Sequence, residues 1–136
     1  MRIKRLIALF LSLSMLFGFF IITVSATMQN TVEPKTSFIR LIDASINVGV
    51  LNTTVTGQVR GTSSVTSIKI KLELQKKTGT TYSTVKTWEE IFYSDEATKT
   101  ESKSTSPFST YRLKATFTVY TSTNSETRVL YAYDSK

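Results

Sequence analysis

Alternating apolar and polar residues form the main pattern along the chain after residue 40. The clearest stretch is residues 68–75, IKIKLELQ, and a second one is residues 111–119, YRLKATFTV. Successive side chains of a β-strand point to opposite faces, so a period of two places the apolar set on a core and the polar set in water. Both stretches therefore predict half-buried strands.

Shorter alternations predict further strands, joined by tight turns. The expected strands are residues 42–50, 55–59, 82–88 and 128–133. Gly79, in a predicted hairpin loop over 75–80, can take the positive φ that such a turn requires. The polar residues 121–125 supply a second turn, which makes residues 111–133 a hairpin.

Two segments break the alternation. Val85 and Trp88 lie three residues apart and cannot share one face of an uninterrupted strand. This spacing predicts either a bulge or a strand that ends near Thr87. Residues 94–107 are polar and predict at most a short edge strand that ends at Pro107.

About seven short strands without an intervening helix are typical of an all-β antiparallel sandwich, and they favour a sandwich over a barrel. The polar segment 94–104 and the last strand, over residues 127–133, are the expected edges. An exposed edge strand can pair with another copy of the chain.

The N-terminal segment has the pattern of a secretory signal peptide. Arg2, Lys4 and Arg5 precede an apolar run over residues 6–24, and small residues follow up to Ala26. This order predicts a hydrophobic signal helix that a signal peptidase removes after Ala26. The alternative is an uncleaved anchor, because about 19 residues at roughly 1.5 Å each can cross a hydrocarbon core of about 30 Å.

The predicted organisation is a signal peptide over residues 1–26, a flexible leader over 27–36 and one domain over 37–136. Loss of residues 1–26 lowers the 17 basic residues to 14, against 10 acidic ones, so the remaining 110 residues have a net charge of +4. That charge is well short of a nucleic-acid-binding surface. The chain has no cysteine, so disulfides cannot stabilise the exported domain, which favours a bacterial origin.

Residues 109–115, STYRLKA, resemble the tyrosine-corner strand of immunoglobulin-like and fibronectin type III-like sandwiches. The resemblance implies that the Tyr111 phenol forms a hydrogen bond back to the chain and that Leu113 points inward. Residues 37–136 also resemble a family of uncharacterised small secreted proteins of Gram-positive bacteria. The shared features are Leu74-Gln75-Lys76, a central Trp88 and the strand from Tyr111 to Tyr120. This resemblance implies an immunoglobulin-like β-sandwich and an extracellular location, and it transfers no catalytic residue.

The residue types that most enzymes and metal sites need are missing. The chain has neither histidine nor cysteine, which removes the commonest general base, metal ligand and thiol nucleophile. Its five glycines lack the spacing of a phosphate-binding loop. Asp95, Glu96 and Glu101 are acidic, but without the spacing of a dedicated calcium loop. We therefore predict a non-enzymatic protein with no cofactor and no metal site.

Two surface features are candidates for binding. Outward positions on the two clearest strands form a basic set, and aromatic residues form a second set. The basic set is Lys69, Lys71, Arg112 and Lys114, and the aromatic set is Trp88, Tyr131 and Tyr133. The basic set would attract an anionic envelope polymer or glycan if the two strands are neighbours, or it is only a solvated face. The aromatic set would stack on sugars, or Trp88 is instead the packing centre of the core.

These observations predict a secreted, non-enzymatic binding or adhesion-type module, either extracellular or loosely held at a bacterial cell surface. The alternatives are a structural or self-assembling surface protein and a carbohydrate-binding module. No nucleic-acid partner is expected, and membrane contact is expected only through the signal segment before cleavage.

Overall fold

The computed structural model describes residues 37–134, so the predicted signal peptide and leader lie outside the described residues. Seven strands make up this part of the chain. They are β1 (Ile39–Val48), β2 (Asn52–Gly61), β3 (Ser67–Thr78), β4 (Thr81–Phe92), β5 (Glu96–Ser104), β6 (Tyr111–Tyr120) and β7 (Ser125–Tyr133). Residues 37–134 contain no helix, and hence none long enough to cross a membrane. The predicted all-β class is confirmed.

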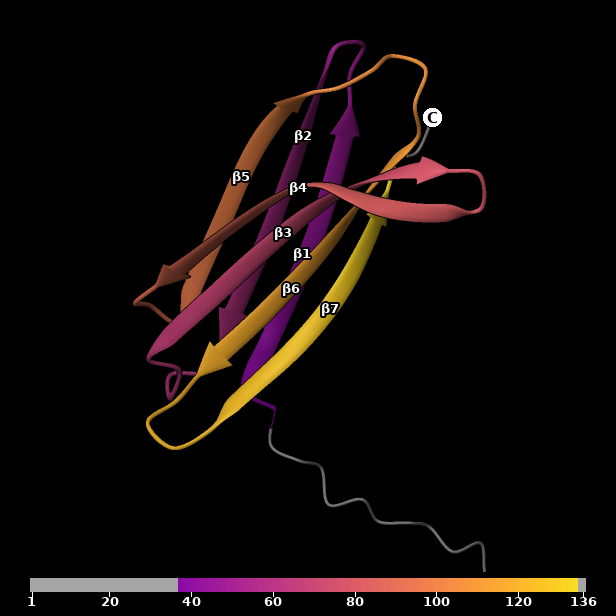
Figure 1. Ribbon diagram of the computed structural model, residues 1–136. Helices are drawn as coiled ribbons and strands as arrows, with labels where there is room; N and C mark the ends of the chain where they lie inside the picture. Colours follow the sequence, from indigo (N-terminus) through magenta and orange to yellow (C-terminus); the bar gives the residue numbers. More distant parts are fainter. Residues whose placement is uncertain (1–36, 135–136) are drawn as a thin grey trace, which may run out of the picture. The chain divides into compact units, whose positions relative to one another are not determined.

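The strands form two antiparallel sheets (Figure 1). One sheet has the order β1-β2-β5 and the other the order β4-β3-β6-β7. Three tight hairpins join β1 to β2, β3 to β4 and β6 to β7, whereas the chain changes sheet after β2, β4 and β5. As predicted, β5 and β7 are edge strands.

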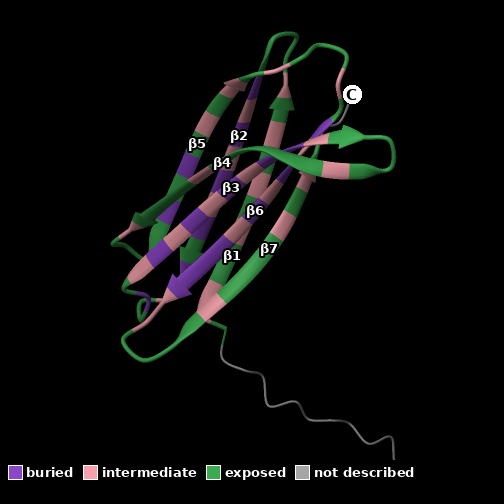
Figure 2. Cartoon of the chain, viewed as in Figure 1, coloured by how far each residue is buried: buried purple, intermediate pink, exposed green. Residues whose placement is uncertain are grey.

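The core lies between the inner faces of β2, β3 and β6, where the buried residues concentrate in Figure 2. The apolar positions of residues 68–75 and 111–119 are buried, as their alternation predicted. Burial of one such side chain contributes about 1.5–3 kcal/mol. The fully buried apolar residues are Val55, Val59, Ile68, Ile70, Leu72, Leu74, Leu113, Ala115, Phe117 and Val119. All of the buried core comes from residues 55–119, so the sandwich has a core of its own.

Gly57 of β2 allows the two sheets to approach closely. A Cβ at this position would lie 2.8 Å from Leu72 Cδ2 and 3.2 Å from Phe117 Cε1. Both of these side chains belong to the opposite sheet and are fully buried. The glycine therefore makes room for two large core residues.

The first hairpin corrects one sequence prediction. Residues 42–50 were expected to form a strand, but β1 ends at Val48 and Val50 lies in the turn with 75 % of its surface exposed. The Gly49 N–H donates to the Asn52 carbonyl over 2.8 Å and reverses the chain there. The apolar alternation thus continues past the end of the strand.

Strand β5 is longer than the sequence predicted. It pairs with β2 along nine residues, from Glu96 to Ser104. The alternation is absent because one inward position of β5 is Lys99, whose Nζ lies 2.8 Å from Glu90 Oε2 and 2.7 Å from Glu101 Oε1. Burial opposes the charged ammonium, but hydrogen bonds to Glu101 and Glu90 outweigh it and raise the pKa of Lys99.

The hairpin of β3 and β4 contains the bulge that the sequence allowed. Leu74 pairs with Lys86 and Gln75 pairs with Thr84, so Val85 is the extra residue on β4. The other option, a strand that ends near Thr87, is wrong, because β4 continues to Phe92. The turn is tighter than the predicted loop over 75–80, and Gly79 has a φ of 63°.

The hydrogen bond predicted at Tyr111 is present. The Ser106 N–H donates to the Tyr111 hydroxyl over 3.1 Å, and the Tyr111 side chain is buried at the start of β6. Leu113, two residues later, is fully buried as expected. The phenol therefore ties the loop between β5 and β6 to the core.

Candidate ligand-binding face of the four-stranded sheet

The outer face of the four-stranded sheet carries most of the predicted binding residues. On adjacent strands β3 and β6, the pairs Gln75 with Arg112 and Glu73 with Lys114 are in register. β7 continues these two rows with Tyr133 and Tyr131. The register therefore brings basic and aromatic side chains together on one surface.

Arg112 is the centre of this surface. Its guanidinium carbon lies 3.9 Å from the ring centroid of Tyr82 and 4.7 Å from that of Tyr131. Its Nη1 lies 3.4 Å from the Tyr133 hydroxyl, and the Tyr82 and Tyr133 rings meet edge to face at 6.5 Å. We call these four residues the arginine–tyrosine cluster. Each cation–π contact of this kind contributes about 0.5–1 kcal/mol at an exposed site.

Gln75 orients the guanidinium group. Arg112 Nε donates to Gln75 Oε1 over 2.7 Å, while Gln75 Nε2 donates to Thr84 Oγ1 over 3.1 Å. Gln75 is buried, and its hydrogen bond to Thr84 on β4 fixes the orientation of its amide. Arg112 is therefore positioned before any ligand arrives.

The basic set lies on one face, because β3 and β6 are neighbours as the prediction required. Its charge is partly compensated by Glu73, whose carboxylate lies 3.4 Å from Lys114 Nζ and 3.9 Å from Lys71 Nζ. Lys69, at the other end of the basic set from Arg112, pairs in register with Thr118. The surface is thus a mixed polar face with a basic excess.

The aromatic set is divided between two faces. Tyr131 and Tyr133 are exposed on the outer face, whereas Trp88 pairs in register with the inward Leu72 and packs against the core. The three residues therefore cannot form one stacking platform, which favours the alternative that Trp88 is a packing residue. Tyr82 takes its place beside Tyr131 and Tyr133.

Sequence reasoning did not assign Tyr82 or Gln75 to the site. A regular β4 strand would place Tyr82 on the same face as Trp88, six residues away. The bulge at Val85 shifts the register by one residue and moves Tyr82 to the outer face. The spacing of Val85 and Trp88 was the available signal for this change.

Two of the three acidic residues considered for calcium, Glu96 and Glu101, pair with basic side chains. Glu96 accepts from Arg60 Nη2 over 2.9 Å, and Glu101 pairs with Lys99. Within residues 37–134, no group of three or more acidic residues gathers to hold a metal ion.

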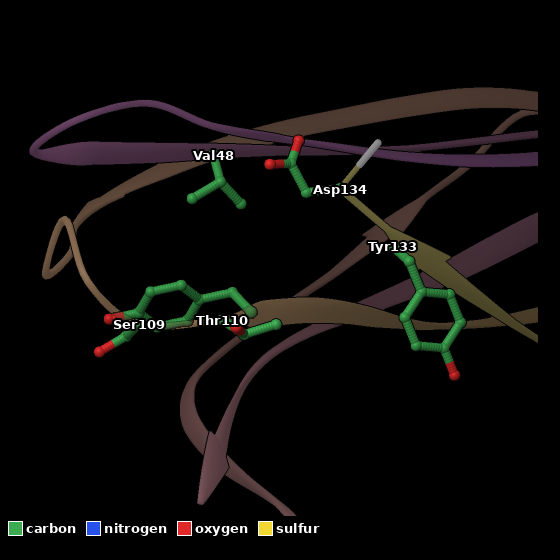
Figure 3. A pocket seen from close by; sticks show the side chains of 6 residues that line it. Val48, Ser109, Thr110, Tyr133 and Asp134 are labelled. Atoms are coloured by element: carbon green, nitrogen blue, oxygen red, sulfur yellow. The ribbon is translucent and has the colours of Figure 1, made fainter. Parts of the chain in front are cut away.

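A hollow of about 270 Å³ lies beside the end of β7, lined by Val48, Ser109, Thr110, Tyr111, Tyr133 and Asp134 (Figure 3). Tyr133 and Asp134 point to opposite sides of the chain, and the carboxyl group of Asp134 lies on the side of Val48. Asp134 Oδ2 is buried without a hydrogen-bond partner among the described residues. Tyr133 also belongs to the arginine–tyrosine cluster, so the hollow adjoins the cluster through this residue.

No protein-family model, curated protein or solved structure matches this chain. The function of the chain is therefore inferred from its sequence and from the geometry of the site.

Proposed function

We propose that the protein is a secreted, non-enzymatic binding module that holds an anionic glycan or envelope polymer on the outer face of its four-stranded sheet. The observation that carries the proposal is the arginine–tyrosine cluster, which continues into the basic set. Tyrosine rings stack on the apolar faces of sugars, and an oriented guanidinium pairs with a carboxylate or phosphate. An acidic saccharide has both kinds of group.

We also propose that the fold is an immunoglobulin-like sandwich. Seven antiparallel strands in two sheets support this, as do the changes of sheet after β2, β4 and β5. The hydrogen bond from Ser106 to Tyr111 is a second support, since it has the form of a tyrosine corner. Secretion, with release or loose retention at a Gram-positive envelope, is proposed from the N-terminal pattern and the family resemblance.

The rival function is a self-assembling surface protein. Both β5 and β7 are edge strands, with one side of each backbone outside the sheet. An inward charge makes an edge a poor partner for another strand, and β5 carries Lys99 at such a position. β7 is therefore the better candidate edge. A molecular mass that increases with protein concentration would favour this rival.

Affinity electrophoresis tests the binding proposal. The protein is run through gels that contain an acidic polysaccharide or a neutral one. We expect retardation by the acidic polymer at low salt, and its loss when Lys69, Lys71, Arg112 and Lys114 are all replaced by Gln. The matched control replaces Arg40, Lys76, Lys86 and Lys103 by Gln, which removes the same charge away from this face, because Lys86 pairs in register with the inward Leu74.

Equal losses in the two quadruple variants would contradict a site on this face, and so would the absence of retardation by any acidic polymer. Retardation by a neutral polysaccharide that persists in high salt and disappears in Tyr131→Ala would instead favour a carbohydrate-binding module.

A further inference from the structure

Two turns lie beside each other at one end of the sandwich. One is the β1–β2 turn, residues 49–51, and the other is the β5–β6 loop, residues 105–110 (Figure 1). The Thr105 N–H donates to the Leu51 carbonyl over 3.0 Å, and the hydroxyls of Thr53 and Thr105 are 2.8 Å apart. These hydrogen bonds hold the two turns together as one structural unit.

The most exposed large apolar residue of the described chain is at this end. Phe108 has 98 % of its surface exposed, and Val50 and Leu51 are also mainly exposed. The Ser109 N–H lies 3.4 Å from the Ser106 carbonyl, so Pro107 and Phe108 are the two central residues of a turn. Proline favours such a turn by its restricted φ, and the turn directs the phenyl ring away from the core.

The apolar residues form a projecting surface. Val50, Pro107 and Phe108 border a hollow of about 490 Å³ between the two turns. Exposed apolar side chains gathered in this way usually mark an interaction site. Because the side chains of Phe108, Val50 and Leu51 project outward, they can insert into the interfacial layer of a lipid bilayer.

Three lysines lie on one side of this apolar surface, along the β5–β6 loop. Lys76 and Lys103 border a second hollow, of about 350 Å³, together with residues 104–106 of the same loop. The Lys77 N–H donates to the Thr110 carbonyl, which places Lys77 at the end of that loop. The segments 49–54, 74–87 and 102–110 contain no acidic residue. One acidic residue, Asp134, lines the neighbouring hollow of about 270 Å³ at the end of β7. The surroundings are therefore strongly basic.

We propose that this end of the sandwich docks on an anionic lipid bilayer. Phe108, Val50 and Leu51 enter the interfacial layer, while Lys76, Lys77 and Lys103 contact lipid phosphates. The combination of projecting apolar residues and a basic rim carries the proposal, because a bilayer surface has an apolar interior beneath anionic head groups. The proposal uses residues outside the arginine–tyrosine cluster, so it stands or falls independently of the proposed function. It adds a membrane contact that the sequence did not predict.

The test uses a chain that begins at Thr27, so that the apolar residues 6–24 cannot bind lipid themselves. The described domain keeps its whole core in such a chain. Phe108→Trp introduces a fluorescent probe at the docking end. Tyr93→Trp places the same probe at another exposed aromatic position, in the turn between β4 and β5. The parent protein, with Trp88 as its single tryptophan, provides the background signal.

Vesicles of phosphatidylcholine, with or without phosphatidylglycerol, are then added. We expect a blue shift of the Phe108→Trp emission with the anionic vesicles, and quenching by brominated acyl chains. Neither change is expected for Tyr93→Trp or for the parent. The affinity for anionic vesicles, measured by co-sedimentation, should fall about tenfold or more in Phe108→Ser, because apolar burial is lost. It should fall about a hundredfold when Lys76, Lys77 and Lys103 are all replaced by Gln.

Several results would overturn the proposal. One is a Phe108→Trp emission that anionic vesicles leave unchanged in the folded protein. Another is an equal response from Tyr93→Trp. A blue shift without vesicles that grows with protein concentration would show that the occupant is a second copy of the chain. Binding by neutral and anionic vesicles alike would exclude the lysines from the interaction.

Discussion

The guanidinium carbon of Arg112 lies 3.9 Å from the ring centroid of Tyr82, although the two residues belong to strands that are not adjacent. β3 lies between β6 and β4, and the two side chains meet above it. Gln75 on β3 accepts a hydrogen bond from Arg112 Nε and thereby supports the contact from below. Through Arg112, strand β6 is therefore joined to Gln75 on β3, to Tyr82 on β4, and to Tyr131 and Tyr133 on β7.

This geometry predicts that Arg112→Lys weakens binding of an acidic polysaccharide without changing the net charge. An ammonium group cannot keep both the Gln75 hydrogen bond and the planar contacts with tyrosine rings. We expect a loss of affinity of about threefold to tenfold, measured by affinity electrophoresis. Arg40→Lys is the control, because Arg40 is an exposed arginine in the other sheet. Equal affinities of Arg112→Lys and the parent would argue against a role for the cluster.

Tyr111→Phe removes the acceptor of the Ser106 N–H. We expect the free energy of unfolding to fall by about 1 kcal/mol, and Tm by about 4–8 °C, because a partly buried donor loses its partner. Thermal unfolding monitored by circular dichroism measures the change. Tyr120→Phe, at the other end of β6, is the control and should change Tm little. Identical Tm values for Tyr111→Phe and the parent would show that the hydrogen bond does not stabilise the fold.

Gly57→Ala adds a methyl group 2.8 Å from Leu72 Cδ2. We expect it to destabilise the protein by about 1–3 kcal/mol, since a packed core accommodates extra volume poorly. Urea unfolding of Gly57→Ala, Leu72→Val and the double variant forms the test. The double variant should be more stable than the sum of the single changes predicts, because Val leaves room for the new methyl group. Strict additivity would contradict the close approach.

We predict that the contact between the Glu126 carboxylate on β7 and the backbone at the start of β1 is sensitive to acid. Its Oε2 accepts from the Phe38 N–H over 2.7 Å, and its Oε1 lies 2.8 Å from Arg128 Nη2. Burial alone would raise the pKa of Glu126, but hydrogen bonds from Arg128, Phe38 and Ser37 outweigh it and hold the pKa below its ordinary value.

A lowered folded-state pKa contributes stability above the ordinary pKa of a glutamate, and that contribution is lost as the pH falls through the folded-state value. The parent should therefore be more stable than Glu126→Gln at neutral pH, and the difference should shrink as the pH is lowered to about 3. Urea unfolding over this range measures both proteins. A difference that does not vary with pH would contradict the argument.

The sequence predicted best where burial repeats at every second residue. In residues 68–75 and 111–119 the alternation predicts the inward face correctly, because the inward positions are apolar and the outward ones are mainly polar. β5 was underestimated, since Lys99 occupies a buried position that an apolar residue would otherwise mark. Val50 was misassigned for the opposite reason, because it continues an apolar alternation into an exposed turn.

For the site, the sequence identified Arg112, Tyr131 and Tyr133 but not their arrangement. The alternation shows which side chains point outward, and the register between strands decides which of them meet. Trp88 and Tyr82 show the difference most clearly. One bulged residue, Val85, leaves Trp88 on the inner face and turns Tyr82 to the outer face.

By itself, the sequence determined the all-β class and the inward faces of the two central strands. Both depend on the order of residues within one segment, and local physics is sufficient to specify them. The resemblance to tyrosine-corner strands added the hydrogen bond of Tyr111, which the structure contains. The tertiary structure alone decided the register, the ion pairs of buried Lys99, the arginine–tyrosine cluster and the position of Phe108 at the same hollow as Val50. Each of these depends on contacts between segments far apart in the chain, which no pattern within a single segment contains.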